Sequence, residues 1–276
     1  MRLDGWTGLD VTRPQAGVLL ITLDHPERLN ALTVAMKRDL IELLTQVQAD
    51  DETRAVVLTG AGRAFCSGDY VHPDYTKEQP GSVPMIEGGH SDAASTYSAL
   101  KMYSQAVNRA LRAVDKPTIA AINGPAVQSG LSLALACDLR FASTTARLGS
   151  GTLRFGLMPD EGGHYLLVQV LGLAGALDFM LRARLIDAPE ARQLGLVGEV
   201  CEPAELLPTA IEQAATFAAG PQLALRMLKR AIYRAAESDF ESALDDIATR
   251  TAITDHHPDA AEGSKAFREK RPPRYA

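Results

Sequence analysis

The amino-acid sequence predicts an α/β fold in which a strand-containing core is followed by a mainly helical C-terminal region. Short apolar runs bounded by turn residues, which are typical of buried strands, are concentrated in the first half of the chain. Longer stretches with apolar residues at helical spacing dominate the second half. Because the two patterns are separated along the chain, we expect a core over residues 1–200 and a helical region over residues 201–276.

Strands and helices are expected to alternate in the first half. Residues 17–24 (GVLLITLD) and 55–59 (AVVLT) predict strands, and residues 33–48 predict an amphipathic helix between them. A long loop is expected over residues 70–97, because this stretch holds several prolines and glycines and few apolar residues. The other elements expected in this half are a helix at 98–113, strands at 118–123 and 139–142, and a short apolar helix at 130–137.

The second half is expected to be almost entirely helical. Several of its segments begin with Asp, Gly or Pro, and Pro189 and Pro221 stand where first-turn prolines are tolerated. The helices expected from these patterns cover residues 162–183, 188–195, 204–218, 221–237 and 239–253.

Charge and composition exclude several classes of protein. The net charge of −6 and the lack of a broad basic stretch argue against nucleic acid as a partner. No run of about 18 apolar residues occurs, so we expect no membrane span. The three cysteines are odd in number and scattered, which predicts no disulfide framework and a cytoplasmic location. Because the histidines lack partners at metal-ligand spacing, we expect no metal site.

Two turns rich in small residues follow predicted strands. The turn at 60–69 follows the strand at 55–59, and the turn at 124–130 follows the strand at 118–123 and opens a helix. Such turns let backbone N–H groups point outward, and the dipole of a helix N-terminus strengthens their attraction for negative charge. Two N–H groups that converge from separate strands are the usual construction of an oxyanion hole.

Six sequence motifs resemble the crotonase superfamily of enoyl-CoA hydratases and isomerases, in the order and spacing of that family. They are PERLNAL at 26–32, RAFCSG at 63–68, AINGPA at 121–126, CDLRFAS at 137–143, FGLMP at 155–159 and FREKR at 267–271. The resemblance implies a spiral of ββα turns with a helical C-terminal region for trimerisation, in a homotrimer or a dimer of trimers. It also implies an acyl-CoA thioester as substrate, with coenzyme A as part of the substrate and no separate cofactor.

The resemblance further implies which residues form the site. The backbone N–H groups of Asp69 and Ser129 would hold the oxygen of an enolate-like intermediate, and the Asp69 side chain is expected to face away or to be paired. The positions implied to bind substrate or coenzyme A are Arg28, Ala64, Gly68, Tyr70, Gly130, Phe267 and Lys270.

The chain departs from the family pattern at its usual acids. The two positions where hydratases carry glutamates hold Ser132 and Thr152, neither of which is a general base by itself. Glu161, which stands before two glycines, resembles the single catalytic glutamate of some enoyl-CoA isomerases. Asp160 is a second candidate acid, and His164 lies at helical spacing from both.

Three functions remain open from the sequence. The first is double-bond isomerisation of an enoyl-CoA with Glu161 as the base. The second is an enoyl-CoA hydratase with a rearranged base, in which Glu161 or Asp160 activates water. The third is a protein that binds CoA thioesters and has lost catalysis, which the missing family glutamates would explain.

Overall fold

A mixed sheet of six strands forms the centre of the protein in the computed structural model, which describes residues 1–70 and 92–275. Its strand order is β1-β2-β3-β4-β6-β9, with β1 antiparallel to β2 and the other neighbours parallel. The strands are β1 (Leu9–Gln15), β2 (Val18–Leu23), β3 (Ala55–Gly60), β4 (Thr118–Ile122), β6 (Leu139–Ser143) and β9 (Glu199–Cys201). β3 and β4 are buried along their whole length, as expected for parallel strands covered on both faces.

A second sheet is built from short strands that follow the long ones. It contains β5 (Pro125–Val127), β7 (Arg147–Gly149) and β8 (Leu185–Asp187), in that order. The chain passes from β4 to β5 and then into α4 (Ser129–Ala136), and it passes again from β6 to β7. The repeated long strand and short strand confirm the ββα spiral expected from the sequence.

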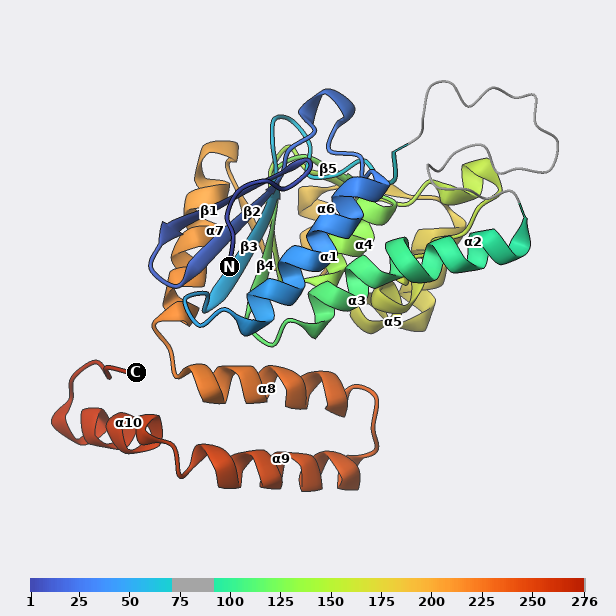
Figure 1. The fold of residues 1–276 in the computed structure, drawn as a ribbon. Helices are drawn as coiled ribbons and strands as arrows, with labels where there is room; N and C mark the ends of the chain where they lie inside the picture. The colour runs from blue at the N-terminus through green and yellow to red at the C-terminus, as the bar shows by residue number, and fades with distance from the viewer. Residues whose placement is uncertain (71–91, 276) are drawn as a thin grey trace.

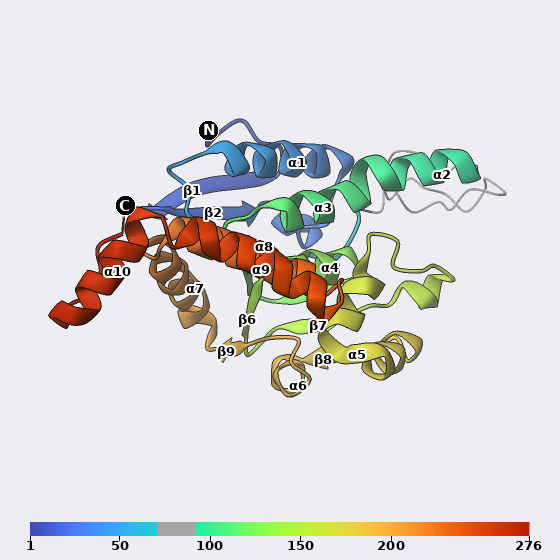
Figure 2. The ribbon, with the colours of Figure 1, turned by 90° about the horizontal axis from the view of Figure 1, so that it is seen from below.

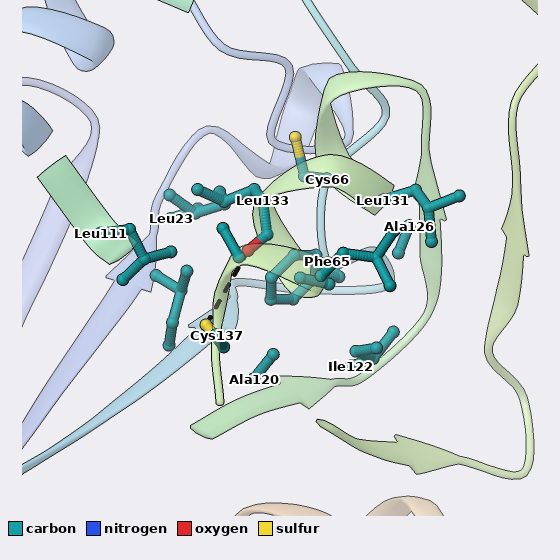
Figure 3. Packing of buried hydrophobic residues seen from close by; sticks show 14 of the residues in the cluster. Leu23, Phe65, Cys66, Leu111, Ala120, Ile122, Ala126, Leu131, Leu133 and Cys137 are labelled. Atoms are coloured by element: carbon teal, nitrogen blue, oxygen red, sulfur yellow. Dashed lines mark hydrogen bonds between the residues drawn. The ribbon is translucent and has the colours of Figure 1, made fainter. Parts of the chain in front are cut away.

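Helices cover both faces of the central sheet (Figure 1). On one side lie α1 (Val34–Ala49), α3 (Gln105–Ala113) and α4, whose apolar residues belong to the larger core cluster. On the other side α7 (Pro203–Ala218) packs through Leu206, Ala210 and Ala214 against apolar residues of the strands. Figure 3 shows Phe65, Leu131, Leu133 and Cys137 gathered in the larger cluster.

The last three helices extend away from this core. They are α8 (Gln222–Ala235), α9 (Phe240–Thr254) and α10 (Pro258–Glu269). Figure 1 shows α8 and α9 side by side below the sheet, and in Figure 2, seen from below, they lie in front of it. A polar cluster ties α8 to the start of β6: Tyr233 donates to Asp138 Oδ1 at 2.6 Å, and Lys229 Nζ lies 2.7 Å from Asp138 Oδ2. Because Asp138 also accepts from Thr118 of β4, one carboxylate joins α8 to two strands.

The structure differs from the predicted elements in several places, and five of the described strands were not expected: β1, β5, β7, β8 and β9. The helix expected at 98–113 begins earlier: Asp92 caps α2 (Ala93–Ala99), and a π-helical turn (Leu100–Ser104) joins it to α3. Residues 71–91 of the loop predicted at 70–97 lie outside the described residues. The division predicted at residue 200 passes through β9, and α7 covers the sheet, so the core extends to about residue 218. Finally, α10 was not expected, since its polar sequence lacks a strong apolar pattern.

The helices not yet described are α5 (Gly163–Leu181) and α6 (Ala188–Gln193), which lie between β7 and β9 in the sequence. Among the helices that the structure describes, α5 is the one long and apolar enough by length and composition to cross a bilayer. Its backbone leaves the helical conformation at Gly172, where φ is 67° and ψ is 173°. Each half is therefore shorter than the roughly 20 residues that a span requires, so α5 is weak support for one. The cytoplasmic location stays a prediction.

Candidate active site

A cavity of about 340 Å³ lies where the two small-residue turns meet the segment before α5. Both predicted oxyanion residues, Asp69 and Ser129, line it together with Glu161. The other lining residues are Arg28, Ala31, Ser67, Tyr70, Gln128, Thr152, Phe155, Leu157, Met158 and Asp160. The structure therefore brings together residues that are separated by up to about 130 positions in the sequence.

The first turn is held by backbone hydrogen bonds that do not use the Asp69 N–H group. Phe65 and Cys66 donate to the Pro125 carbonyl oxygen at 3.1 and 3.0 Å, and Tyr70 donates to Leu32 at 3.0 Å. Gly68 has a φ of 107°, which a side chain would strain. In the part of the chain that the structure describes, no acceptor is found for the Asp69 N–H. It is therefore available to a bound group.

The second turn leaves a matching N–H group at the start of α4. Gln128 donates to the Gly149 carbonyl oxygen at 2.9 Å, whereas the Ser129 N–H has no acceptor among the described residues. Gln128 adopts a φ of 53° and a ψ of −123°, a conformation that favours glycine. A Cβ at Gly130 would lie 2.2 Å from the Cys66 carbonyl oxygen, so only glycine lets the two turns approach this closely.

The Asp69 side chain is paired, as the sequence analysis expected. One oxygen, Oδ2, lies 2.7 Å from Lys37 Nζ of α1, and Ser104 Oγ lies 2.9 Å from the same ammonium. The Lys37 side chain is 3% exposed, although lysine is rarely buried without a charge partner. The pair offsets the negative charge that Asp69 would otherwise place beside its own N–H group.

Glu161 is the most deeply buried acid of the cavity, with 5% of its surface exposed. Ser132 of α4 donates a hydrogen bond of 2.5 Å to Glu161 Oε1, and Asn108 Nδ2 donates to the Glu161 carbonyl oxygen at 3.0 Å. Burial raises the pKa of Glu161 to about 7, the Ser132 hydrogen bond opposes this rise, and the neighbouring Asp160 carboxylate adds to it. A carboxyl group with this pKa exchanges a proton readily near neutral pH.

Asp160 is the second acid of the cavity and interacts directly with the first. Burial raises the pKa of Asp160, and a side-chain hydrogen bond with Glu161 opposes that rise. Its backbone is fixed because Gln105 Nε2 of α3 donates to the Asp160 carbonyl oxygen at 3.0 Å. The two carboxyl groups therefore influence each other's titration.

The residues at the family's usual acid positions have other partners. Ser132 contacts Glu161, a hydrogen bond that joins positions 29 apart in the sequence. A Cβ at Gly163 would lie 2.1 Å from Ser132 Oγ, so a glycine there leaves room for this hydrogen bond. Thr152 Oγ1 lies 3.2 Å from Ser150 Oγ at the cavity wall. Sequence reasoning found both positions but missed that Ser132 would hold Glu161.

The other predicted site residues fall into three groups. Arg28 and Tyr70 line the cavity, and the Arg28 guanidinium lies 5.9 Å from the centre of the Tyr70 ring. Ala64, Gly68 and Gly130 shape the turns without lining the cavity; the Ala64 carbonyl oxygen accepts from Asn30 Nδ2 at 2.7 Å.

Phe267 and Lys270 form the third group, which the fold does not bring to the cavity of the same chain. Both are exposed at the end of α10, and Phe267 is 86% exposed. Their predicted contact with coenzyme A therefore requires a second copy of the chain and stays a prediction.

His164 is exposed on the first turn of α5. None of the described hydrogen bonds or ion pairs joins it to Asp160 or Glu161, so the structure does not support the pairing considered from the sequence. No group of three His, Cys, Asp or Glu residues suited to a metal ion is found within the described residues. The expectations of no metal and no cofactor stay predictions.

The spiral of ββα units with two opposed turns is the fold of the crotonase superfamily. A solved enoyl-CoA hydratase from Bacillus anthracis shares it, with a TM-score of 0.88 and 31% identity over 98% of this chain and 99% of that one. The sequence model of the enoyl-CoA hydratase/isomerase family matches residues 13–276, and this chain belongs to that family.

Relatives in the family differ in the reactions that their names give. A 1,2-epoxyphenylacetyl-CoA isomerase of Escherichia coli (strain K12) is 33% identical over 95% of both chains. A short-chain-enoyl-CoA hydratase of Clostridium acetobutylicum is 32% identical over 85% of this chain and 84% of its own. Family membership thus supports an enoyl-CoA hydratase/isomerase type of enzyme and leaves its exact reaction open.

Proposed function

We propose that this protein isomerises the double bond of an enoyl-CoA, with Glu161 as the base that moves the proton. One observation carries the proposal: Glu161 is buried in the cavity with a pKa raised to about 7 and borders the same space as the Asp69 and Ser129 N–H groups. A single such carboxyl group suffices for an isomerase, because the same base can remove a proton from C2 and deliver one to C4.

In the proposed reaction the thioester oxygen accepts hydrogen bonds from Asp69 N–H and Ser129 N–H. Glu161 removes a proton from C2 of a 3-enoyl thioester, and the electrons of that C–H bond form the C1–C2 double bond of a dienolate. The negative charge gathers on the oxygen, where each N–H donor contributes about 3 kcal/mol. Glu161 then protonates C4, and the double bond comes to lie between C2 and C3.

Ser132 and Asp160 would adjust Glu161 for this task. The hydroxyl of Ser132 holds Oε1, which leaves the other carboxyl oxygen to handle the proton. The Asp160 carboxylate favours the protonated form of Glu161 by charge repulsion. Opposing influences of this kind keep the group near its midpoint at neutral pH.

Binding of the coenzyme is proposed to involve Arg28 and Tyr70 at the cavity wall and Phe267 and Lys270 from a second copy. The exposed large apolar residues support an assembly of copies, because several gather on α5 and on the C-terminal helices. They include Val168, Leu173, Leu177, Leu181, Leu228, Ile232, Phe240 and Leu244. A homotrimer or a dimer of trimers would cover such faces.

Hydration of a 2-enoyl-CoA is the second candidate. It is favoured by the Asp160 and Glu161 pair, since two carboxyl groups can divide the activation of water and the delivery of a proton to C2. The loss of catalysis with retained CoA binding is the third.

Incubation with 3-enoyl-CoA and 2-enoyl-CoA in deuterated water separates the three. Migration of the double bond with deuterium at C2 or C4 is expected, and 3-hydroxyacyl-CoA as the product would instead assign hydration. Glu161→Gln is expected to abolish the reaction, and His164→Gln, an exposed neighbour, serves as the matched control. Activity that survives Glu161→Gln unchanged would show that the base is another residue.

A further inference from the structure

The segment that carries both candidate acids has little regular structure. It lies between the 3₁₀ turn Thr152–Phe155 and α5, and residues 156–162 belong to no helix or strand. The backbone hydrogen bonds described for these residues all remain within residues 152–166, so none of them reaches the sheet or another helix. Loop segments are generally more mobile than the elements that they connect, and a catalytic side chain on a loop needs other contacts to hold it.

Two amide side chains of α3 supply such contacts. Gln105 Nε2 donates a hydrogen bond to the Asp160 carbonyl oxygen at 3.0 Å, and Asn108 Nδ2 donates to the Glu161 carbonyl oxygen, also at 3.0 Å. The two donors stand three positions apart, which places them on one face of the helix. We refer to Gln105 and Asn108 as the amide clamp.

The amide clamp holds the backbone on both sides of the Glu161 Cα atom. The Asp160 carbonyl belongs to the peptide group before that atom, and the Glu161 carbonyl belongs to the peptide group after it. Because each peptide group is planar, holding both carbonyl oxygens fixes the backbone dihedral angles of Glu161. These angles set the direction in which the side chain leaves the backbone. Ser132 holds the other end of the same side chain at Oε1.

The helix that carries the amide clamp is itself fixed in the fold. Val107 and Leu111 of α3 are buried in the larger core cluster. Ser104 Oγ, directly before α3, accepts a hydrogen bond of 2.9 Å from Lys37, which is the charge partner of Asp69. The same part of the chain therefore contacts the segment of the acids and the side chain of one oxyanion residue.

We propose that Gln105 and Asn108 are positioning residues that aim the Glu161 carboxyl group at the reacting carbon atoms of the thioester. Neither is among the residues that line the larger cavity, so both act through the backbone of the base. This inference rests on the proposed function, because it takes Glu161 to be the base. A misplacement of about 1 Å can reduce a rate about 100-fold, so loss of the clamp should slow the chemical step even when the thioester binds normally.

The test replaces each amide by an apolar side chain of similar size. Gln105→Met and Asn108→Leu should each lower kcat for isomerisation of 3-enoyl-CoA about tenfold, and the double variant should lower it about 100-fold. The KM should change by less than about twofold, because the groups that bind the thioester are untouched. Arg109→Met, on the exposed side of the same helix, is the matched control and should keep the wild-type kcat.

The pH profile separates positioning from the two other roles that buried amides can have. A badly aimed base is slow at every pH, so the loss in kcat should persist up to pH 10. A contribution to folding alone would lower the Tm and leave the kcat of the folded protein unchanged. An effect on the pKa of Glu161 would shift the profile, and the loss would disappear at high pH. Either of these two results overturns the inference.

A crystal structure of the wild-type protein with butyryl-CoA, which has no double bond to move, needs no variant. Both hydrogen bonds of the amide clamp should be present in it at about 3 Å, and the absence of either would overturn the inference. If the clamp variants keep the wild-type kcat while Glu161→Gln is inactive, the inference fails and the proposed function stands. Activity that survives Glu161→Gln would overturn both.

Discussion

Removal of the Ser132 hydroxyl should shift the pH dependence of the reaction to higher pH. Ser132 Oγ donates a 2.5 Å hydrogen bond to Glu161 Oε1 and thereby stabilises the carboxylate form. A hydrogen bond to a charged group contributes about 1.5–3 kcal/mol. Since 1.36 kcal/mol corresponds to one pH unit, Ser132→Ala should move the midpoint of kcat/KM upward by about one to two pH units.

The sign of this shift follows from the form that each partner prefers. Glu161 acts as a base when it is ionised, and its pKa of about 7 is already raised by burial and by Asp160. Without Ser132 the ionised form loses its donor, and the pKa of Glu161 rises further. At pH 7 the variant should therefore be about 5- to 50-fold less active, and much of the loss should disappear at pH 9.

The assay is kcat/KM for isomerisation of 3-enoyl-CoA, measured from pH 5 to pH 10. Thr152→Val is the matched control, because Thr152 lines the same cavity and its hydroxyl partner is Ser150 rather than Glu161. Its profile should coincide with that of the wild type. A Ser132→Ala midpoint that is unchanged, or that moves to lower pH, would refute the assignment of Glu161 as the base held by Ser132.

Three further predictions concern stability. Glu161→Gln should stabilise the fold above pH 7 by up to about 3 kcal/mol. Because the pKa of Glu161 is raised from 4.5 to about 7, ionisation of this buried group lowers the free energy of unfolding as the pH rises through that range, and glutamine does not ionise. An equal increase in Tm at pH 4 would contradict this reasoning. Gln128→Gly should raise the Tm in thermal denaturation, since the backbone conformation of Gln128 costs about 1–3 kcal/mol for a residue other than glycine. A lower Tm would argue against strain at this position. Lys37→Met should lower the free energy of unfolding, measured in urea titrations, by about 3–5 kcal/mol, because it leaves the buried Asp69 carboxylate unpaired. The double variant with Asp69→Ala should recover most of this loss. Additive losses would mean that the two side chains are not coupled.

The local features of the site were predictable from the sequence, because each depends on neighbouring residues. The two turns follow apolar strands, and their small residues predict exposed N–H groups, which the structure places on one cavity through Asp69 and Ser129. The glycines at 68 and 130 follow the same logic, since one adopts a positive φ and the other meets a carbonyl oxygen. Apolar spacing also predicted β2, β3, β4 and β6 and most of the helices, but not the other five described strands or α10.

Contacts between distant segments were not predictable in this way. Lys37 lies on the helix expected at 33–48, and spacing alone assigns it no partner 32 residues away. The start of the helix before α3 was placed too late, because the cap at Asp92 stands beside a stretch rich in turn residues. The Lys37 and Asp69 ion pair forms only after the chain has folded, whereas the Asp92 cap is a local contact with Ala94 and Ser95 that apolar spacing does not reveal.

The position of the Glu161 carboxyl group explains why the first of the usual family glutamates is absent. The position of the first usual acid holds Ser132 on α4, and Glu161 Oε1 lies 2.5 Å from the Ser132 oxygen. A carboxyl group therefore still borders the space beside the α4 position, but it arrives from the segment before α5. Gly163 permits this approach, since any larger residue would collide with Ser132. The loss of an acid at 132 and the presence of one at 161 are thus better explained as one change, in which a short hydroxyl on α4 makes room for the Glu161 carboxyl group and holds it, than as two unrelated features.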